Sequence, residues 1–398
     1  MSATPASIES GTENLRIGEL HPALLRTAGK VSAAAGHIAI VLHDLRGGGA
    51  ERAVLRLARG MAAAGRHVEL ILVRGEGAYL DEIPAGIELK ILGCPRVSQS
   101  IFALARHLRR TRPRAVLSAL THMNLATVAA ARLSRLPLRV VLSERNQISS
   151  KAREAAGAWQ KMLYRTVPHI YRAADAIVAV SGGVAADLAD FGRLSERNIR
   201  VIHNPVFDTD VETRAQAPAN HSWFDGKGPP IVVAAGRLHR QKGFDLLLEA
   251  FAIARAEVDC RLVILGEGPE RAALTATAER LGLAYDIDMP GFADNPFPLM
   301  RRAGAFVLSS RWEGFPNALV EAMACGAPVI AADCPSGPRE ILGDGRYGML
   351  VPPENPRALG QALIAMLTAR PDTQISETRA QSFSVAAAAA QYLDVLEG

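Results

Sequence analysis

Two glutamates, Glu313 and Glu321, stand eight residues apart in the segment RWEGFPNALVEAMA. Pro316 suits the first turn of a helix that begins at that point, which places Glu321 on the helix and Glu313 in the loop before it. Because Gly314 and Pro316 break any common helical face, we do not expect the rigid acid/base dyad of a glycosidase. We expect each carboxylate to bind a different part of one extended, hydroxylated ligand; a helix with charged ends is the alternative.

The start of this predicted helix is a candidate site for an anionic part of the same ligand. Backbone N–H groups in the first turn of a helix have no partner within the helix and attract phosphate. The residues at this helix start are Phe315, Pro316, Asn317, Ala318 and Leu319.

A second candidate for anion binding is the loop in VAAGRLHRQKGFDLLLEAF, where Arg237 and Lys242 lie between an apolar strand and a helix. Two cations at the carboxyl end of a strand, beside a helix N-terminus, would hold a diphosphate. They would also stabilise the charge that develops as the diphosphate leaves. Two solvated loop cations are the alternative interpretation.

Three consecutive glycines, Gly47, Gly48 and Gly49, follow the first apolar strand and precede a helix. Glycine lets a backbone approach a ligand closely, and the helix start would again favour phosphate. The spacing matches neither the dinucleotide fingerprint nor the P-loop, so a plain tight turn remains the alternative.

The elements that must position these loops follow a regular alternation of apolar, β-branched runs with helical stretches. Near-continuous apolar strands that alternate with helices predict parallel sheets covered on both faces. In such sheets ligands bind at the carboxyl ends of the strands. We predict strands at 37–42, 67–73, 87–92, 114–120, 138–143, 176–181, 199–205, 230–236, 261–266, 285–291, 305–310, 327–333 and 348–353.

The alternation pauses over a polar stretch, 206–229, that contains Pro and Gly and shows no periodicity. This composition predicts a linker between two doubly wound α/β domains. The expected order is a loose extension over 1–35, a first domain over 36–206, a linker over 207–229, a second domain over 230–375, and a C-terminal helix over 376–398 that packs back on the first domain.

The overall composition agrees with this division, since 398 residues exceed one ordinary core and 49% are hydrophobic while 21% are charged. No stretch approaches the roughly 18 uninterrupted apolar residues that a membrane-spanning helix needs. The four cysteines are far apart and flanked by apolar runs, which predicts buried thiols of a cytoplasmic protein rather than a metal cluster or a disulfide framework.

Charge is distributed unevenly, because residues 36–206 carry 25 Lys and Arg but only 13 Asp and Glu. A basic first half suits an anionic membrane surface, a phosphorylated acceptor or nucleic acid. The densest basic stretch, RHLRRTRPR at 106–114, has no aromatic side chain for base stacking. We therefore favour membrane or lipid phosphate over nucleic acid, with a merely solvated face as the alternative.

Taken in order, these segments resemble the retaining glycosyltransferase family 4, whose fold is called GT-B. The resemblance rests on the Glu313 to Glu321 spacing and on GGAERAVLRLA, SERN, HNPV, GRLHRQKGFDLLLEAFA and LGEGPER, and it spans about residues 37–370. It implies two Rossmann-like domains that face each other across a cleft.

The resemblance also implies roles for individual residues. Glu321 would hold the ribose hydroxyls of a nucleotide-sugar donor, and Glu313 would lie beside the transferred sugar. Arg237 and Lys242 would bind the diphosphate, together with amides around Gly48 and at 315–318. The loop PGFAD at 290–294, which contains Phe292, would face the nucleobase.

In the first domain, His122 follows a strand and would lie near the primary hydroxyl of the sugar, although an ordinary capping histidine is the alternative. Arg145 and Asn146 are expected to line the cleft without an assigned role.

The function that the resemblance implies is transfer of a hexose or N-acetylhexosamine from a UDP-sugar, with retention, to a saccharide or lipid-linked saccharide of a cell-surface polysaccharide or lipopolysaccharide. We expect no metal and no other cofactor, no nucleic-acid partner, and a cytoplasmic location with peripheral contact to the inner membrane face. A nucleotide-sugar epimerase of the same shape and a non-catalytic nucleotide-sugar-binding protein are the alternatives.

Overall fold

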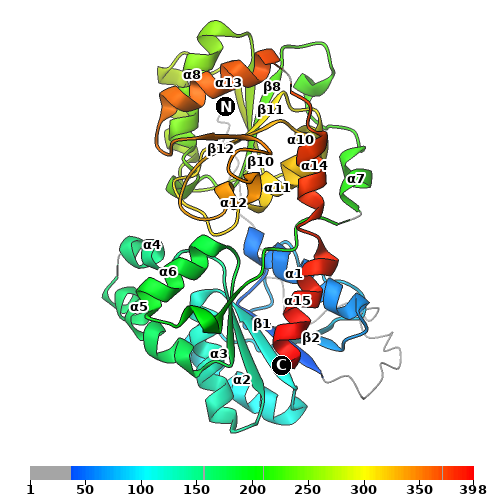
Figure 1. Cartoon of the computed structure of the whole chain (residues 1–398), viewed down its shortest axis with the longest axis vertical. Helices are drawn as coiled ribbons and strands as arrows, with labels where there is room; N and C mark the ends of the chain where they lie inside the picture. The colour runs from blue at the N-terminus through cyan, green and yellow to red at the C-terminus, as the bar shows by residue number, and fades with distance from the viewer. Residues whose placement is uncertain (1–36, 156, 209, 370) are drawn as a thin grey trace, which may run out of the picture.

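The computed structural model describes residues 37–155, 157–208, 210–369 and 371–398, so the extension predicted over 1–35 lies outside the described residues. The chain forms two α/β lobes stacked along the long axis of the molecule (Figure 1). Each lobe contains one sheet whose strands pair in parallel, seven strands in the first and six in the second. The predicted fold class is therefore confirmed.

The sheet of the first lobe has the order β3-β2-β1-β4-β5-β6-β7. Its central strands are buried on both faces, as the continuous apolar runs predicted. The strands are β1 (Ile38–Leu42), β2 (Val68–Leu72), β3 (Glu88–Ile91), β4 (Ala115–Ala119), β5 (Arg139–Glu144), β6 (Ala176–Ala179) and β7 (Ile199–Val201). The helices are α1 (Gly49–Ala63), α2 (Val97–Thr111), α3 (Thr121–Ser134), α4 (Ile148–Glu154), α5 (Ala158–Ile170) and α6 (Gly182–Gly192), with 3₁₀ turns at Tyr171–Ala173 and Glu196–Asn198.

The sheet of the second lobe has the order β10-β9-β8-β11-β12-β13. Its strands are β8 (Ile231–Ala235), β9 (Arg261–Leu265), β10 (Ile287–Gly291), β11 (Ala305–Leu308), β12 (Val329–Ala332) and β13 (Met349–Val351). Its helices are α8 (Phe244–Glu257), α9 (Arg271–Arg280), α10 (Phe297–Arg301), α11 (Asn317–Ala324), α12 (Pro338–Leu342) and α13 (Pro356–Ala369), with a 3₁₀ turn at Arg240–Lys242.

The chain crosses between the lobes twice. The first crossing leaves β7 and enters α7 (Asp210–Ala215) and a 3₁₀ turn at Ser222–Phe224. The second follows α14 (Gln374–Gln381), which lies on the second lobe, and ends in α15 (Val385–Glu397), which lies on the first (Figure 1).

Helix α15 is part of the core of the first lobe. Tyr392 and Leu396 belong to the same buried cluster as Ile40 and Leu42 of β1. The helix also packs closely against α1, since a Cβ atom on Gly60 would lie 2.8 Å from the Cβ atom of Ala389. The position of α1 is therefore set by the last helix of the chain as well as by the sheet.

Three local features differ from the sequence predictions. Strand β3 was expected to be buried, but Leu89 and Ile91 are exposed because β3 is an edge strand. The segment expected to lack periodicity contains α7, where Arg214 lies over the ring of Phe297 in α10. Among the cysteines, Cys94 is only half-buried, whereas the other three are buried.

None of the described helices has the length and apolar character needed to span a bilayer.

Candidate active site

The loop after β8 and the loop after β11 are held together at the carboxyl edge of the second sheet. Gly243, next to Lys242, has φ +62°, and a Cβ atom there would lie 2.2 Å from the carbonyl oxygen of Ser309. Only glycine permits this approach without displacement of the backbone. The Ser309 hydroxyl also donates to the carbonyl of Lys242 at 2.9 Å, so the two loops form one structural unit.

Glu313 is the centre of a buried polar cluster in this unit. Its Oε1 atom accepts from the Lys242 ammonium at 2.6 Å and from the Ser310 hydroxyl at 2.6 Å. The side chain is 5% exposed. Lys242 is therefore paired with Glu313, the carboxylate predicted to lie beside the sugar. This pairing holds the Lys242 ammonium in a fixed position.

Arg237 lies in the same loop as Lys242 but is exposed to solvent. Within the described parts of the chain it makes no side-chain hydrogen bond or ion pair. Its guanidinium is consequently available to a ligand.

Helix α11 begins at Asn317, with Pro316 at the N-cap, and Pro316 supplies no side-chain hydrogen bond to this end of the helix. Glu313 precedes the helix and Glu321 lies within it, as the sequence predicted. The ring of Phe315 is stacked on the ring of His203, with the ring centroids 5.2 Å apart. The side chain of Leu319 lies in the core, and its amide donates to the Pro316 carbonyl.

Glu321 receives a partner from the other lobe that the sequence did not reveal. The Nη2 atom of Arg56, on α1, donates to Oε1 of Glu321 at 3.0 Å. Both side chains are buried, at 9% exposed for Arg56 and 7% for Glu321. The second carboxylate oxygen has no partner among the described residues, so it remains open to a ribose hydroxyl.

The glycine loop lies against the start of α11 across the lobe interface. The amide of Asn317 donates to the Gly49 carbonyl at 2.8 Å, and its oxygen accepts from the Asn204 amide at 2.8 Å. Gly47 has φ +102° and Gly48 is the uncapped N-cap of α1. The starts of α1 and α11 thus meet at one place.

Arg145 and Asn146, which the sequence predicted to line the cleft, have their backbone packed against Gly314 of the other lobe. A Cβ atom on Gly314 would lie 2.0 Å from the Arg145 carbonyl oxygen and 3.1 Å from the Asn146 Cα atom. Arg145 is 4% exposed, and its Nη1 atom donates to Oδ1 of Asn204 at 2.7 Å.

His122 is in the first turn of α3, just after β4. Burial lowers its pKa to about 4, with a further contribution from the charge of His43, whose ring lies edge-on at 5.6 Å. The imidazole is therefore neutral at physiological pH and suited to hydrogen bonding with an uncharged hydroxyl.

The predicted nucleobase loop places Phe292 at the surface, where its side chain is 51% exposed. The backbone of this loop follows β10, and the loop leads to Asp294 and Asn295, which line a cavity between the lobes.

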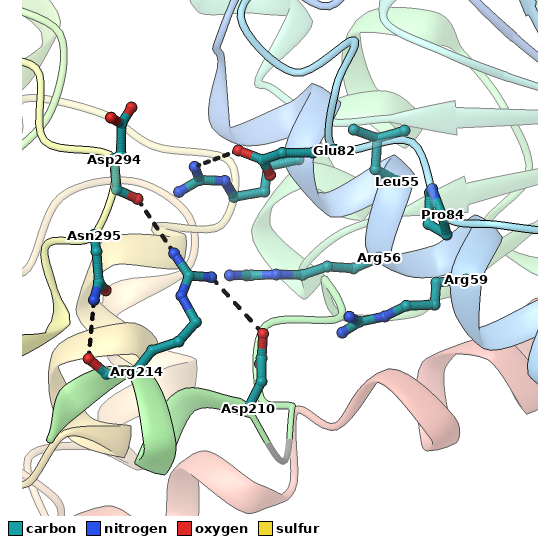
Figure 2. A pocket seen from close by; sticks show the side chains of 10 residues that line it. Leu55, Arg56, Arg59, Glu82, Pro84, Asp210, Arg214, Asp294 and Asn295 are labelled. Atoms are coloured by element: carbon teal, nitrogen blue, oxygen red, sulfur yellow. Dashed lines mark hydrogen bonds and ion pairs between the residues drawn. The ribbon is translucent and has the colours of Figure 1, made fainter. Parts of the chain in front are cut away.

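The cavity has a volume of about 430 Å³. Figure 2 shows Arg56 and Arg59 extending from α1 towards Arg214 and Asp210 of α7. Because Arg56 also binds Glu321, the cavity lies next to the candidate ribose site. It is lined by Arg52, Leu55, Arg56, Arg59, Glu82, Pro84, Asp210, Arg214, Asp294 and Asn295. The described residues include no group of three or more His, Cys, Asp and Glu side chains placed to hold a metal ion.

Two family models match the chain in succession. Glycosyltransferase Family 4 matches residues 47–210, in the first lobe. Glycosyl transferases group 1 matches residues 229–369, in the second lobe.

Among curated proteins, the chain is 33% identical over 198 residues to an N-acetylgalactosamine-N,N'-diacetylbacillosaminyl-diphospho-undecaprenol 4-alpha-N-acetylgalactosaminyltransferase of Campylobacter jejuni, covering 50% of this chain and 52% of that protein. It is 30% identical over 185 residues to the lipopolysaccharide 1,6-galactosyltransferase of Salmonella typhimurium, covering 45% and 49%. The chain thus spans about half the length of these relatives.

Among solved structures, Anabaena HepE in complex with UDP-glucose superposes with a TM-score of 0.77 at 19% identity, covering 91% of this chain and 99% of that one. The apo form of the lipopolysaccharide outer core galactosyltransferase WaaB superposes with a TM-score of 0.68 at 20% identity, with the same coverage. At this identity the likeness concerns the fold.

Proposed function

The chain belongs to glycosyltransferase family 4, with the GT-B fold, and we propose that it transfers a hexose or N-acetylhexosamine from a UDP-sugar to a saccharide or lipid-linked saccharide. We place this reaction in lipopolysaccharide or cell-surface polysaccharide biosynthesis, with retention of the anomeric configuration. The relatives named above, two of which act on lipid-linked or lipopolysaccharide acceptors by name, support this placement.

The observation that carries the proposal is the cluster of Lys242, Glu313 and Ser310 beside the uncapped start of α11. Lys242 and Arg237 supply two positive charges, and the amides of Asn317 and Ala318 supply fixed dipoles. Together these groups can hold a diphosphate without a divalent cation. A metal-free reaction is accordingly part of the proposal.

In this reaction the bond between the anomeric carbon and the diphosphate oxygen breaks as the acceptor oxygen bonds to the same carbon. The acceptor hydroxyl proton passes to an oxygen of the leaving diphosphate. Glu313 would position the transferred sugar through its second oxygen, while neutral His122 would hydrogen-bond a sugar hydroxyl from the first lobe. Glu321 would bind the ribose.

Peripheral contact with an anionic membrane is a further part of the proposal. Arg106, Arg109 and Arg110 are exposed on α2, and Phe102, one turn before Arg106, is 72% exposed. Cations near an anionic leaflet contribute about 1 kcal/mol each. Co-flotation of the protein with vesicles should therefore require anionic lipid. It should be weaker in a Phe102→Ser/Arg106→Ser variant. Equal co-flotation with neutral and with anionic vesicles would contradict this contact.

The proposed activity is tested by a screen of UDP-, GDP- and ADP-sugars for binding and for slow hydrolysis, with and without chelator. We expect a UDP-sugar to bind and to be hydrolysed slowly whether or not EDTA is present. Binding of no nucleotide-sugar would overturn the proposal, and preference for GDP or ADP would overturn the assignment of the base. Conversion of the sugar without hydrolysis would indicate an epimerase, and loss of turnover with EDTA would refute the metal-free reaction.

A further inference from the structure

Arg145 is a buried cation without an acidic partner. It lies directly after β5, is 4% exposed, and no carboxylate of the described residues is within salt-bridge distance of its guanidinium. Its Nη1 atom donates to the uncharged Asn204, whereas Nε and Nη2 are buried and have no hydrogen-bond partner among the described residues. Because a buried, unpaired charge is strongly unfavourable, this arrangement indicates that an anion completes the site.

The position of Arg145 shows where that anion would bind. Asn204, which accepts from Arg145, also donates to Asn317 at the start of α11, and Asn317 in turn donates to Gly49 at the start of α1. Neither N-cap residue, Gly48 or Pro316, supplies a side-chain hydrogen bond to its helix. Arg145 is therefore linked to a place where the starts of two helices from opposite lobes meet.

Two glutamates near this place do not neutralise Arg145. The carboxylate of Glu144 accepts from the Arg145 backbone amide, not from its guanidinium. Burial raises the pKa of Glu51, and the charge of Arg145 only partly opposes that shift. The carboxylate of Glu51 lies against Gly48, at 2.1 Å from where a Cβ atom of that glycine would be.

We propose that Arg145 binds the diphosphate of the nucleotide donor from the first lobe, as a third cation opposite Arg237 and Lys242. This inference rests on the proposed function and adds a residue to it. The N–H of Nε and one N–H of Nη2 point in parallel from one edge of the planar guanidinium and can donate together to two oxygens of one phosphate group. They would stabilise the charge that forms on the diphosphate as its bond to the sugar breaks.

The location of Arg145 has a consequence for the order of events. Arg237 and Lys242 stand on the second lobe with the donor, whereas Arg145 reaches the diphosphate only while the lobes are in contact. Departure of the diphosphate would thus be assisted fully only when the lobes are closed and the acceptor is in place, which protects the donor from hydrolysis in the open form.

The test compares the affinity of the full-length protein for UDP and for UMP by titration calorimetry. UMP lacks the terminal phosphate, so the ratio of the two affinities isolates the contacts to that group. We expect Arg145→Met to reduce the preference for UDP over UMP by about tenfold or more, as for loss of a charge-assisted, bidentate contact, with the affinity for UMP nearly unchanged. Arg165→Met, at an exposed arginine on α5, is the matched control and should retain the preference.

Two further results separate failure of this inference from failure of the proposed function. A wild-type protein that binds neither UDP nor UMP would refute the proposed donor itself. A wild-type preference for UDP that Arg145→Met retains would refute the role of Arg145 alone.

Should the methionine variant fail to fold, Arg145→Lys provides the test, because it keeps the charge and loses the planar pair of donors. Inorganic pyrophosphate should raise the melting temperature of the wild type more than that of this variant. Equal shifts in the two proteins would overturn the inference.

Discussion

Lys242 illustrates how one residue is prepared for an anionic ligand before the ligand arrives. Its ammonium lies 2.6 Å from Glu313, which is buried and also accepts from Ser310. The hydrogen bond fixes the long side chain, so little conformational entropy remains to be lost when a diphosphate binds. The same contact balances the charge of the buried Glu313 carboxylate.

The Lys242→Ala variant should lower kcat by roughly 10²-fold or more, because one preorganised charge stabiliser is lost. Steady-state kinetics with the donor found in the screen measures this effect. Arg240→Ala is the control, since Arg240 is an exposed cation two residues away. Turnover close to wild type in Lys242→Ala would remove this residue from the diphosphate site.

Glu321→Ala should act mainly on the donor, raising its KM, because the ribose hydroxyls lose their acceptor. The variant also leaves Arg56 buried without its carboxylate, and loss of one partner of a buried pair costs about 3–5 kcal/mol. Donor titration and thermal unfolding should therefore both change. A fall in stability with unchanged nucleotide affinity would limit Glu321 to an inter-lobe ion pair.

Strand β5 shows how an element of the first lobe presents its carboxyl end to the cleft. Its last residue, Glu144, accepts from the Tyr171 hydroxyl at 2.7 Å and from the Thr121 hydroxyl at 3.1 Å. It also accepts from the amide of Arg145 at 3.2 Å. Burial raises the pKa of Glu144 to about 7, although these hydrogen bonds lower it. The loop that carries Arg145 is therefore hydrogen-bonded to a carboxyl group that titrates near neutral pH.

A pH dependence of stability follows from this raised pKa. The folded protein binds the proton of Glu144 more tightly than the unfolded chain, so its contribution is most favourable below about pH 4.5 and is lost as the pH rises through about 7. Glu144→Gln should therefore stabilise the protein at pH 8 by roughly 1–3 kcal/mol relative to its effect at pH 4.5. Urea unfolding at the two pH values measures the difference; equal effects would contradict a buried carboxylate. His122 titrates in both proteins and cancels in the comparison.

At the scale of elements, periodicity and composition predicted the strand and helix order, because buried parallel strands leave long apolar runs. They did not predict the exposure of β3, because whether a strand lies at the edge depends on the strand order. They also did not predict helix α7, whose six residues are too few to show a period.

Within the site, the positions of Glu313 and Glu321 on either side of the α11 start were predictable from Gly314 and Pro316. The partners Arg56 and Asn204 were not, because they come from another lobe and local sequence carries no sign of that contact.

At the scale of the whole molecule, a carboxylate of the second lobe binds the start of a helix in the first lobe. Glu340, on α12, accepts from the amides of Gly182 and Gly183 at 3.0 and 3.1 Å, at the start of α6 in the other lobe. His203 lies 3.2 Å from the same carboxylate. Burial alone would raise the pKa of Glu340, but the hydrogen bonds from His203 and the two amides lower it overall. This contact holds the lobes together on the side of the crossing segments.

Because the pKa of Glu340 is lowered, the closed arrangement gains stability above about pH 4.5 and loses it as the pH falls through the lowered value. Glu340→Ala should favour more open forms at neutral pH, with a larger radius of gyration in solution scattering and kcat reduced by about tenfold. Glu354→Ala is the control, since Glu354 is an exposed acid paired within its own lobe to Arg311. An unchanged radius in Glu340→Ala would show that other contacts keep the lobes closed.

The docking of α15 on the first lobe has a consequence for biosynthesis of the protein. Tyr392 and Leu396 complete the cluster around β1, yet they emerge from the ribosome after the whole second lobe. Residues of α1 belong to the same cluster, so during translation this face of the first sheet is only partly covered while the second lobe folds, although domains generally fold in the order of synthesis. The first lobe of the nascent chain should therefore remain a substrate for chaperones until α15 has left the ribosome.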